Sequence, residues 1–427
     1  MNADFIIHNA SQILTMAGGP QRGQKLGELS VIENGAVAIK GELIIATGPS
    51  HKLSKQYQST HEIDAEGRVV MPGFVDPHTH LIWAGDRATE FEMRLAGASY
   101  MEIMNAGGGI LSTVRLTRSA RVDELVDQAR GRLTRMLEHG TTSVEVKTGY
   151  GLETGSELRM MEAILHLDDE NPVELIPTFL GAHAIPAEFS DDPEGYTDLI
   201  CDEMLPALVS WWEDNAGKRP LPFVDVFCET GAFNLEQSRR ILEHAKELGF
   251  QLKIHADEFD GLGGTGLAVE LGATSADHLV RTPMEDIKAL GASQTVAVSL
   301  PCTPFGLAES DYTPAEAILE AGGILALATD LNPGTAWCES MQFPIALACR
   351  YMHLTPAQAI TAATINAAAA VDRADRIGSL EPSKQADVLI LDIPDYRHLG
   401  YRFGVNLVST VIKRGKIVYS RGGEEII

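Results

Sequence analysis

The sequence lacks the features that mark secreted and membrane-spanning proteins. Its five cysteines are scattered and form no CxxC pair, which is typical of free thiols in a reducing compartment. It contains no apolar run of about 18 residues or more, so we expect no membrane span. The first residues, MNADFIIHNASQ, have neither a basic stretch nor a long apolar core, so we expect no signal peptide and a cytoplasmic location.

Positive charge is also scarce. The 34 lysines and arginines are outnumbered by 59 aspartates and glutamates, which gives a formal net charge of −25. Such a chain repels nucleic acid and anionic membranes, so we expect neither as a partner. A small anionic substrate remains compatible with this charge, provided that a few cationic side chains line its pocket.

The middle of the 427-residue chain alternates short apolar runs with segments that are apolar at helical spacing, such as 121–139 and 235–248. This α/β alternation favours a (β/α)8 TIM barrel over an open sheet. Both ends of the chain show short strands and turns, and we predict that they form one small β-sandwich together. We expect residues 1–70 and 376–427 in the sandwich and 71–375 in the barrel. The eight expected barrel strands are the run before His78 and residues 142–146, 174–180, 224–227, 251–254, 274–276, 295–298 and 324–328.

The stretch 69–81, VVMPGFVDPHTHL, carries His78 and His80 at the end of an apolar run. Residues two apart on a strand point to the same face, so both imidazoles project together. Two nitrogen ligands side by side favour a metal site. The HxH motif is short, however, and the plain alternative is a pair of polar residues leaving a strand.

Ligand-capable side chains follow most of the later strands. The C-terminal ends of barrel strands meet at one face, where functional residues cluster. Three histidines and one carboxylate suit Zn²⁺ or Fe²⁺, and we assign His78, His80, His255 and Asp330 to a single metal ion. Such an ion lowers the pKa of a bound water from 15.7 to roughly 7.

Two groups are candidates for moving protons in such a site. Glu258 lies three residues beyond His255, and His278 ends the next strand. The sequence does not decide which of the two is the principal base. We count both, together with Asp330, as candidate catalytic residues.

Anion-binding groups are less certain from the sequence. Arg87, seven residues past His80, offers a fork for a carboxylate, although a surface arginine is the plainer interpretation. The turn at 332–335 offers backbone N–H groups to an anion. The glycines of 261–266 match GxGxxG, but their place after His255 favours a loop over a dinucleotide site. Residues 107–109, three glycines, suggest a mobile loop that closes over the pocket.

These motifs together resemble the amidohydrolase superfamily. PGFVDPHTH ends the first strand, a lone HAD histidine the fifth, and an aspartate the eighth, while IGSLEP is similar to the superfamily's tail. Within it, the match is close to members that hydrolyse 4-imidazolone-5-propanoate to N-formimidoyl-L-glutamate in histidine degradation. The matching segments are HTHLIWAGDRATEFEMRLAGASY, AGGGILSTVRLTR, HGTTSVEVKTGYGL, PTFLGAHAIP, DVFCETGAF, KIHADEF, SADHL and ATDLNPGT.

The resemblance implies hydrolytic ring opening at one Zn or Fe ion, divalent or trivalent, held by the four ligands above, in a homodimer. It also implies a polar role for His278. Cys302 and the pair 383–384 depart from the superfamily pattern, and the first of these lies close enough to the pocket to alter it. The implied substrate contacts are Arg87, Tyr150, His183, Glu258, Asn332, Gly334 and Thr335.

Three other functions stay open at this point. A mononuclear-metal deaminase of a purine, pyrimidine or related ring would use the same ligands, but a neutral base needs no carboxylate clamp such as Arg87. A metal-free binding or scaffold protein on the same fold would not need all four ligands. An NAD enzyme rests on the glycine match alone.

Overall fold

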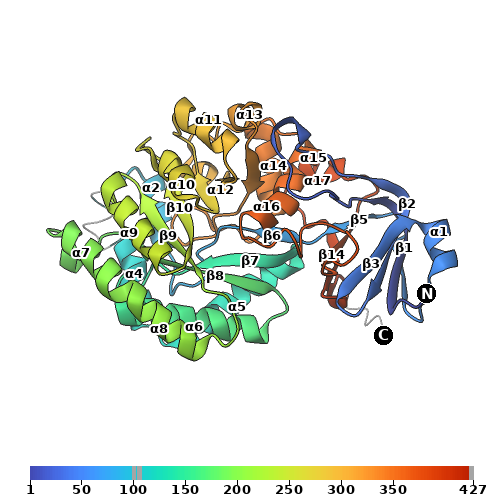
Figure 1. The fold of residues 1–427 in the computed structure, drawn as a ribbon, viewed down its shortest axis with the longest axis horizontal. Helices are drawn as coiled ribbons and strands as arrows, with labels where there is room; N and C mark the ends of the chain where they lie inside the picture. Colours follow the sequence, from blue (N-terminus) through green and yellow to red (C-terminus); the bar gives the residue numbers. More distant parts are fainter. Residues whose placement is uncertain (99–101, 103–107, 423–427) are drawn as a thin grey trace.

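The computed structural model describes residues 1–98, 102 and 108–422 of the chain (Figure 1). One of its two eight-stranded sheets is parallel throughout, in the order β13-β12-β11-β10-β9-β8-β7-β6, so each strand pairs with its neighbour in sequence. The predicted barrel is therefore confirmed. Its strands are β6 (Phe74–Asp76), β7 (Thr141–Lys147), β8 (Glu174–Ala182), β9 (Phe223–Cys228), β10 (Gln251–Ala256), β11 (Ser275–His278), β12 (Val296–Ser299) and β13 (Ile324–Leu327).

Helices cover the outer face of this sheet (Figure 1). The barrel strands are buried along almost their whole length, because one face packs inside the barrel and the other against these helices. Among the described residues, no helix combines the length and apolar character needed to cross a membrane. The helices around the barrel are α2 (Ala88–Leu95), α4 (Ile110–Ser119), α5 (Val122–Glu138), α6 (Thr154–Glu170), α7 (Pro193–Leu199), α8 (Leu205–Asn215), α9 (Leu235–Glu247), α10 (Gly264–Leu271), α11 (Met284–Ala292), α12 (Cys302–Leu307), α13 (Ala315–Glu320), α14 (Gln342–Tyr351), α15 (Pro356–Ala362), α16 (Ile365–Ala369) and α17 (Arg397–Tyr401).

The first and last barrel strands meet through the segments just beyond their C-terminal ends. The backbone N–H of His80 donates to the carbonyl of Leu331 at 2.8 Å, and that of Asp330 donates to the carbonyl of His78 at 3.2 Å. Segments about 250 residues apart in sequence are thereby joined where the predicted metal ligands lie. The hydrogen bonds that close the barrel therefore also bring His78, His80 and Asp330 together.

The second sheet contains strands from both ends of the chain and lies to one side of the barrel (Figure 1). Its order is β16-β15-β14-β5-β1-β2-β3, with β4 beside β1. The shared terminal domain is confirmed as one mixed sheet. Its strands are β1 (Phe5–Ile13), β2 (Ile32–Lys40), β3 (Leu43–Pro49), β4 (Glu62–Asp64), β5 (Val69–Pro72), β14 (Val388–Leu391), β15 (Val408–Lys413) and β16 (Lys416–Ser420), with α1 (Ser50–Gln56) after β3.

This sheet folds over its own apolar core. The backbone of Ile44 in β3 exchanges hydrogen bonds with Ser383 (2.8 Å) and Lys384 (2.9 Å), which tie one edge of the sheet to the segment before β14. The departure at 383–384 thus lies in the terminal sheet, remote from the barrel mouth.

The chain passes from the terminal sheet to the barrel at Gly73. A Cβ atom at this position would lie 2.2 Å from Oγ1 of Thr142 in β7. Only glycine therefore allows the start of β6 to lie this close to β7. Because β5 pairs with β1 and β14, we propose that the first domain division lies at Gly73 rather than after residue 70. The division after residue 375 stays a prediction.

Candidate metal centre

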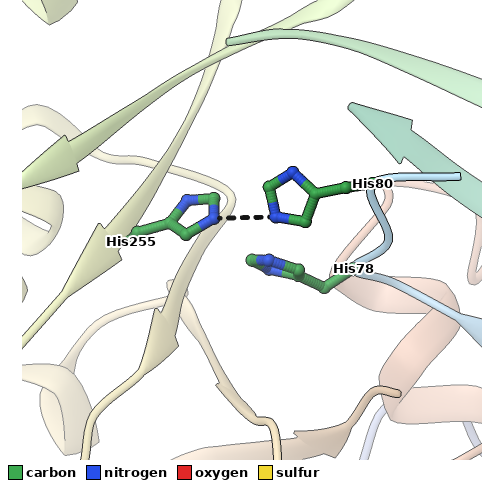
Figure 2. Close-up of side chains that lie close together, drawn as sticks. All are labelled: His78, His80 and His255. Atoms are coloured by element: carbon green, nitrogen blue, oxygen red, sulfur yellow. Dashed lines mark hydrogen bonds between the residues drawn. The ribbon is translucent and has the colours of Figure 1, made fainter. Parts of the chain in front are cut away.

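The four side chains assigned as metal ligands lie together at the C-terminal mouth of the barrel; Figure 2 shows the three histidines. Nε2 of His80 and Nε2 of His255 are 3.4 Å apart. Oδ1 of Asp330 lies 3.6 Å from Nε2 of His78 and 3.7 Å from Nε2 of His80. All four side chains are almost completely buried.

This donor set fits a small divalent cation. Zinc–nitrogen bonds of about 2.0–2.1 Å separate tetrahedral ligands by about 3.4 Å, close to the 3.4–3.7 Å measured between donor atoms here. Within the described part of the chain, the buried Nε2 of His78 has no hydrogen-bond partner. A buried lone pair without a partner is costly, and a cation would satisfy it. His278 lies within ligand distance of His78 and Asp330 as well.

Burial favours the neutral form of His78, His80 and His183. It lowers the pKa of His78 and of His80 well below 6.5, and the nearby ionisable groups Lys147, for His78, and His183, for His80, add to the effect. Burial also lowers the pKa of His183 to about 3. Neutral imidazole is the form that coordinates a metal.

Asp330 is held in an unusual conformation. Its φ of +54° lies in the left-handed region, and the Asn332 side chain donates to its carbonyl at 2.7 Å. The Thr303 hydroxyl donates to Oδ2, which leaves Oδ1 facing the histidines. Burial raises the pKa of Asp330 to about 6, against the lowering effect of the Thr303 hydrogen bond. Thr303 was not singled out from the sequence, although its neighbour Cys302 was; the Cys302 side chain packs with Ala336 and Leu347.

The two candidate proton-transfer groups lie beside each other. Oε2 of Glu258 is 3.6 Å from Nε2 of His278, and both side chains are nearly buried. Burial, followed by the charge of Asp330, raises the pKa of Glu258 well above 4.5. His278 has a φ of +81°, and the hydroxyl of Thr313 donates to its carbonyl at 2.6 Å.

Arg87 contacts the turn that was predicted to bind an anion. Its Nε donates to Glu90 at 2.8 Å, and its Nη1 would lie 2.4 Å from a Cβ atom placed on Gly334. A larger residue at 334 would therefore displace the guanidinium from this position. Glu90 also accepts from the backbone N–H of Gly109 at 3.0 Å. The proposed closing loop begins at residue 107, which lies outside the described residues.

The turn itself differs from the expected backbone cradle. The N–H groups of Gly334 and Thr335 both donate to Oδ1 of Asn332 at 2.8 Å. These donors are taken within the turn, so the prediction that they cradle an anion is wrong for this conformation. The side chains of Asn332 and Thr335 remain candidates for substrate contact.

Tyr150 and His183 complete one wall beside the histidines. The His183 ring stacks on His80 at 4.8 Å between centroids, and the Tyr150 ring lies 5.2 Å from His183. Buried Glu157 accepts from the N–H groups of Gly149, Gly151 and Leu152 and so fixes the loop that carries Tyr150. Sequence reasoning missed Glu157, because a glutamate within a helix gives no local signal of this role.

The glycine pattern at 261–266 has a packing explanation. The side chain of Asp257 accepts from the N–H groups of Gly263 and Thr265, so the loop wraps around a carboxylate of the barrel. A Cβ atom on Gly264 would lie 2.9 Å from Cβ of Ala256. These contacts support the interpretation of the glycines as a βα loop.

Sequence comparison places this site in a known family. The amidohydrolase family pattern matches residues 69–418. The chain belongs to the amidohydrolase family. An imidazolonepropionase of Herpetosiphon aurantiacus is 55% identical over 418 residues, covering 98% of this chain and 97% of that protein. One of Chloroflexus aggregans is 51% identical over 419 residues, covering 97% and 98%. Within the family, the chain belongs with the imidazolonepropionases.

Solved structures share the fold at much lower identity. An adenosine deaminase from Xanthomonas campestris with bound zinc has a TM-score of 0.72 at 19% identity, covering 97% of this chain and 93% of that one. The guanine deaminase of E. coli has a TM-score of 0.73 at 16% identity, covering 97% and 99%. At these identities, the likeness speaks for the fold alone.

Proposed function

We propose that the chain hydrolyses the ring amide of 4-imidazolone-5-propanoate to N-formimidoyl-L-glutamate, with one Zn or Fe ion held by His78, His80, His255 and Asp330. The observation that carries this proposal is the cluster of three buried imidazoles and one carboxylate at 3.4–3.7 Å separations. The family membership supports the choice of substrate. The metal supplies a water of lowered pKa and polarises the ring carbonyl when it is bound.

The other side chains of the site bind and orient the substrate. Arg87 holds the propionate of the substrate through the guanidinium nitrogens other than the Nε that donates to Glu90, and Tyr150 lines the same space. Asn332, Gly334 and Thr335 shape the turn beside Arg87. His183, with its Nδ1 bonded to the Gly149 carbonyl at 2.9 Å, presents Nε2 toward the substrate. These contacts orient the ring carbonyl toward the metal.

Glu258 and His278 move the protons. Water adds to the ring carbonyl carbon, the carbon–nitrogen bond breaks, and the proton lost by water is delivered to the leaving ring nitrogen. The buried pair at 3.6 Å provides an acceptor and a donor for this transfer. Asp330 takes part as the carboxylate ligand next to the reacting carbon.

The direct test follows the imidazolone absorbance after addition of the purified protein, with identification of N-formimidoyl-L-glutamate as the product. Guanine and cytosine serve as controls for a deaminase. Loss of absorbance with the imidazolone alone is expected. Ammonia released from guanine or cytosine, with the imidazolone unchanged, would reject the proposal. The accompanying proposals of a homodimer and a cytoplasmic location are tested by light scattering and by cell fractionation.

A further inference from the structure

Five charged side chains form a buried cluster next to the candidate metal centre. They are carried by β7 and by the three adjacent strands β9, β10 and β11, with β8 between β7 and β9, and each is 0% exposed. Two lysines face three carboxylates, so the cluster carries a net negative charge when all are ionised. Burying so many charges is costly and contributes little to stability by itself, which suggests a positional role. The members are Glu145, Lys147, Asp225, Lys253 and Asp277.

Two of these carboxylates contact the far side of metal-site imidazoles. Nδ1 of His78 donates to Asp277 Oδ2 at 2.6 Å, and the Ser275 hydroxyl donates to Asp277 Oδ1 at 2.6 Å. Asp225 Oδ2 lies 3.0 Å from Nδ1 of His255, within ion-pair distance although this nitrogen makes no aligned hydrogen bond among the described residues. The backbone N–H of His255 donates to Asp225 Oδ1 at 3.2 Å. A carboxylate at Nδ1 keeps the proton there and leaves Nε2 as a free lone pair.

Lys147 connects the two carboxylates. Its Nζ donates to Asp225 Oδ2 at 2.7 Å, the same oxygen that faces the imidazole, and to Glu145 Oε1 at 2.6 Å. The same Nζ lies 3.8 Å from Asp277 Oδ2. One ammonium group is thus hydrogen-bonded to the oxygen behind His255 and lies within ion-pair distance of the oxygen behind His78, which Lys253 Nζ also approaches at 3.9 Å.

We infer that Lys147 is a positioning residue for the metal centre, acting through Asp225 on His255 and through Asp277 on His78. It sets both Nε2 lone pairs toward the cation before the cation binds. The inference rests on the proposed metal-dependent function, but it concerns metal affinity rather than turnover.

A second buried lysine provides a matched control. Lys413 in β15 of the terminal sheet is 2% exposed and donates to Asp387 at 2.8 Å and, across to the start of β7 in the barrel, to Ser143 at 3.2 Å. Its replacement also removes a buried charge from an ion pair, without touching the imidazoles. Lys253 is less suitable, because its Nζ donates to the carbonyl of Pro77, next to His78, at 2.9 Å.

The experiment measures zinc affinity of the full chain, freed of metal, by competition with a chromophoric chelator. The variants Lys147→Met, Asp225→Asn and Asp277→Asn are expected to bind zinc about 10- to 100-fold more weakly. Lys413→Met is expected to lower the melting temperature and to leave the zinc dissociation constant unchanged. The double variant of Lys147→Met with Asp225→Asn should lose less zinc-binding free energy than the two single variants lose together, because both substitutions act through one contact.

Several outcomes overturn the inference. Unchanged zinc affinity in both asparagine variants does so even where Lys147→Met fails to fold. Equal weakening in Lys413→Met does so as well, because general destabilisation then explains the loss. An unsubstituted chain that takes up no zinc also overturns it. If the affinities follow the expected order but the protein does not open the imidazolone ring, the proposed function fails and the positioning role stands.

Discussion

Removing the guanidinium of Arg87 should weaken substrate binding and leave the chemical step almost intact. Glu90 holds Nε at 2.8 Å, so the other nitrogens are oriented beside Gly334 before the substrate arrives. A hydrogen bond to a charged partner contributes about 1.5–3 kcal/mol. Arg87→Ala should therefore raise KM by about 10- to 150-fold. The value of kcat should change little, because the carboxylate is held equally in the ground and transition states.

The assay is the initial rate of imidazolone loss over a range of substrate concentrations. Gly334→Ala gives an independent route to the same defect, since the added Cβ would lie 2.4 Å from Arg87 Nη1 and displace the guanidinium. Arg121→Ala is the control, because that side chain is 69% exposed and pairs with Asp123 and Glu124. An unchanged KM in both Arg87→Ala and Gly334→Ala would refute the reasoning, as would a fall in kcat alone.

Three further predictions concern protons and the metal. Because burial raises the pKa of Glu258 well above 4.5, its ionised form grows as pH rises through that pKa, and kcat/KM should rise with it. Glu258→Gln should remove this limb and lower kcat by about 10²–10⁴-fold; a limb that survives in this variant but disappears in His278→Asn would make the histidine the base. Thr303→Val removes the hydrogen bond that lowers the pKa of Asp330, so a proton should compete with zinc more strongly at pH 6 than at pH 8, whereas Thr303→Ser should bind zinc normally. Removal of metal by a chelator should abolish ring opening and lower the melting temperature, since free zinc at ~1,000 times its Kd stabilises by about 4 kcal/mol; equal melting curves with and without zinc would contradict this.

The sequence alone predicts the barrel because most of its strands, buried on both faces, contain short apolar runs that alternate with segments apolar at helical spacing. It also predicts which residues meet at the mouth, since the carboxyl ends of parallel strands share one edge. His255 and Asp330 could be assigned beside His78 and His80 on this rule, although they are far apart in the chain. The strand alone determines where the backbone of a residue at its end lies, whichever way the side chain points.

Contacts that depend on side-chain direction could not be predicted in the same way. The expectation that the N–H groups at 334 and 335 bind an anion failed because both groups donate to the side-chain oxygen of Asn332. The partnership of Asp277 with His78 joins residues 199 positions apart, and no local pattern distinguishes it from an ordinary strand-end aspartate. The sequence at 69–76 did not reveal a change of sheet, since β5 and β6 are both short, mainly apolar strands but pair with different partners.

Burial explains why the mouth of the barrel should select a metal ion over protons. It lowers the pKa of His78 and His80 and raises that of Asp330 to about 6, so each group is driven toward its neutral form. For the imidazoles, the neutral form is the ligand, and a proton on Nε2 would add an unpaired buried charge. For Asp330, a cation reverses the effect of burial, because the nearby positive charge favours the carboxylate. A single divalent ion therefore suits all four ligands at once, whereas protons suit only the carboxyl group.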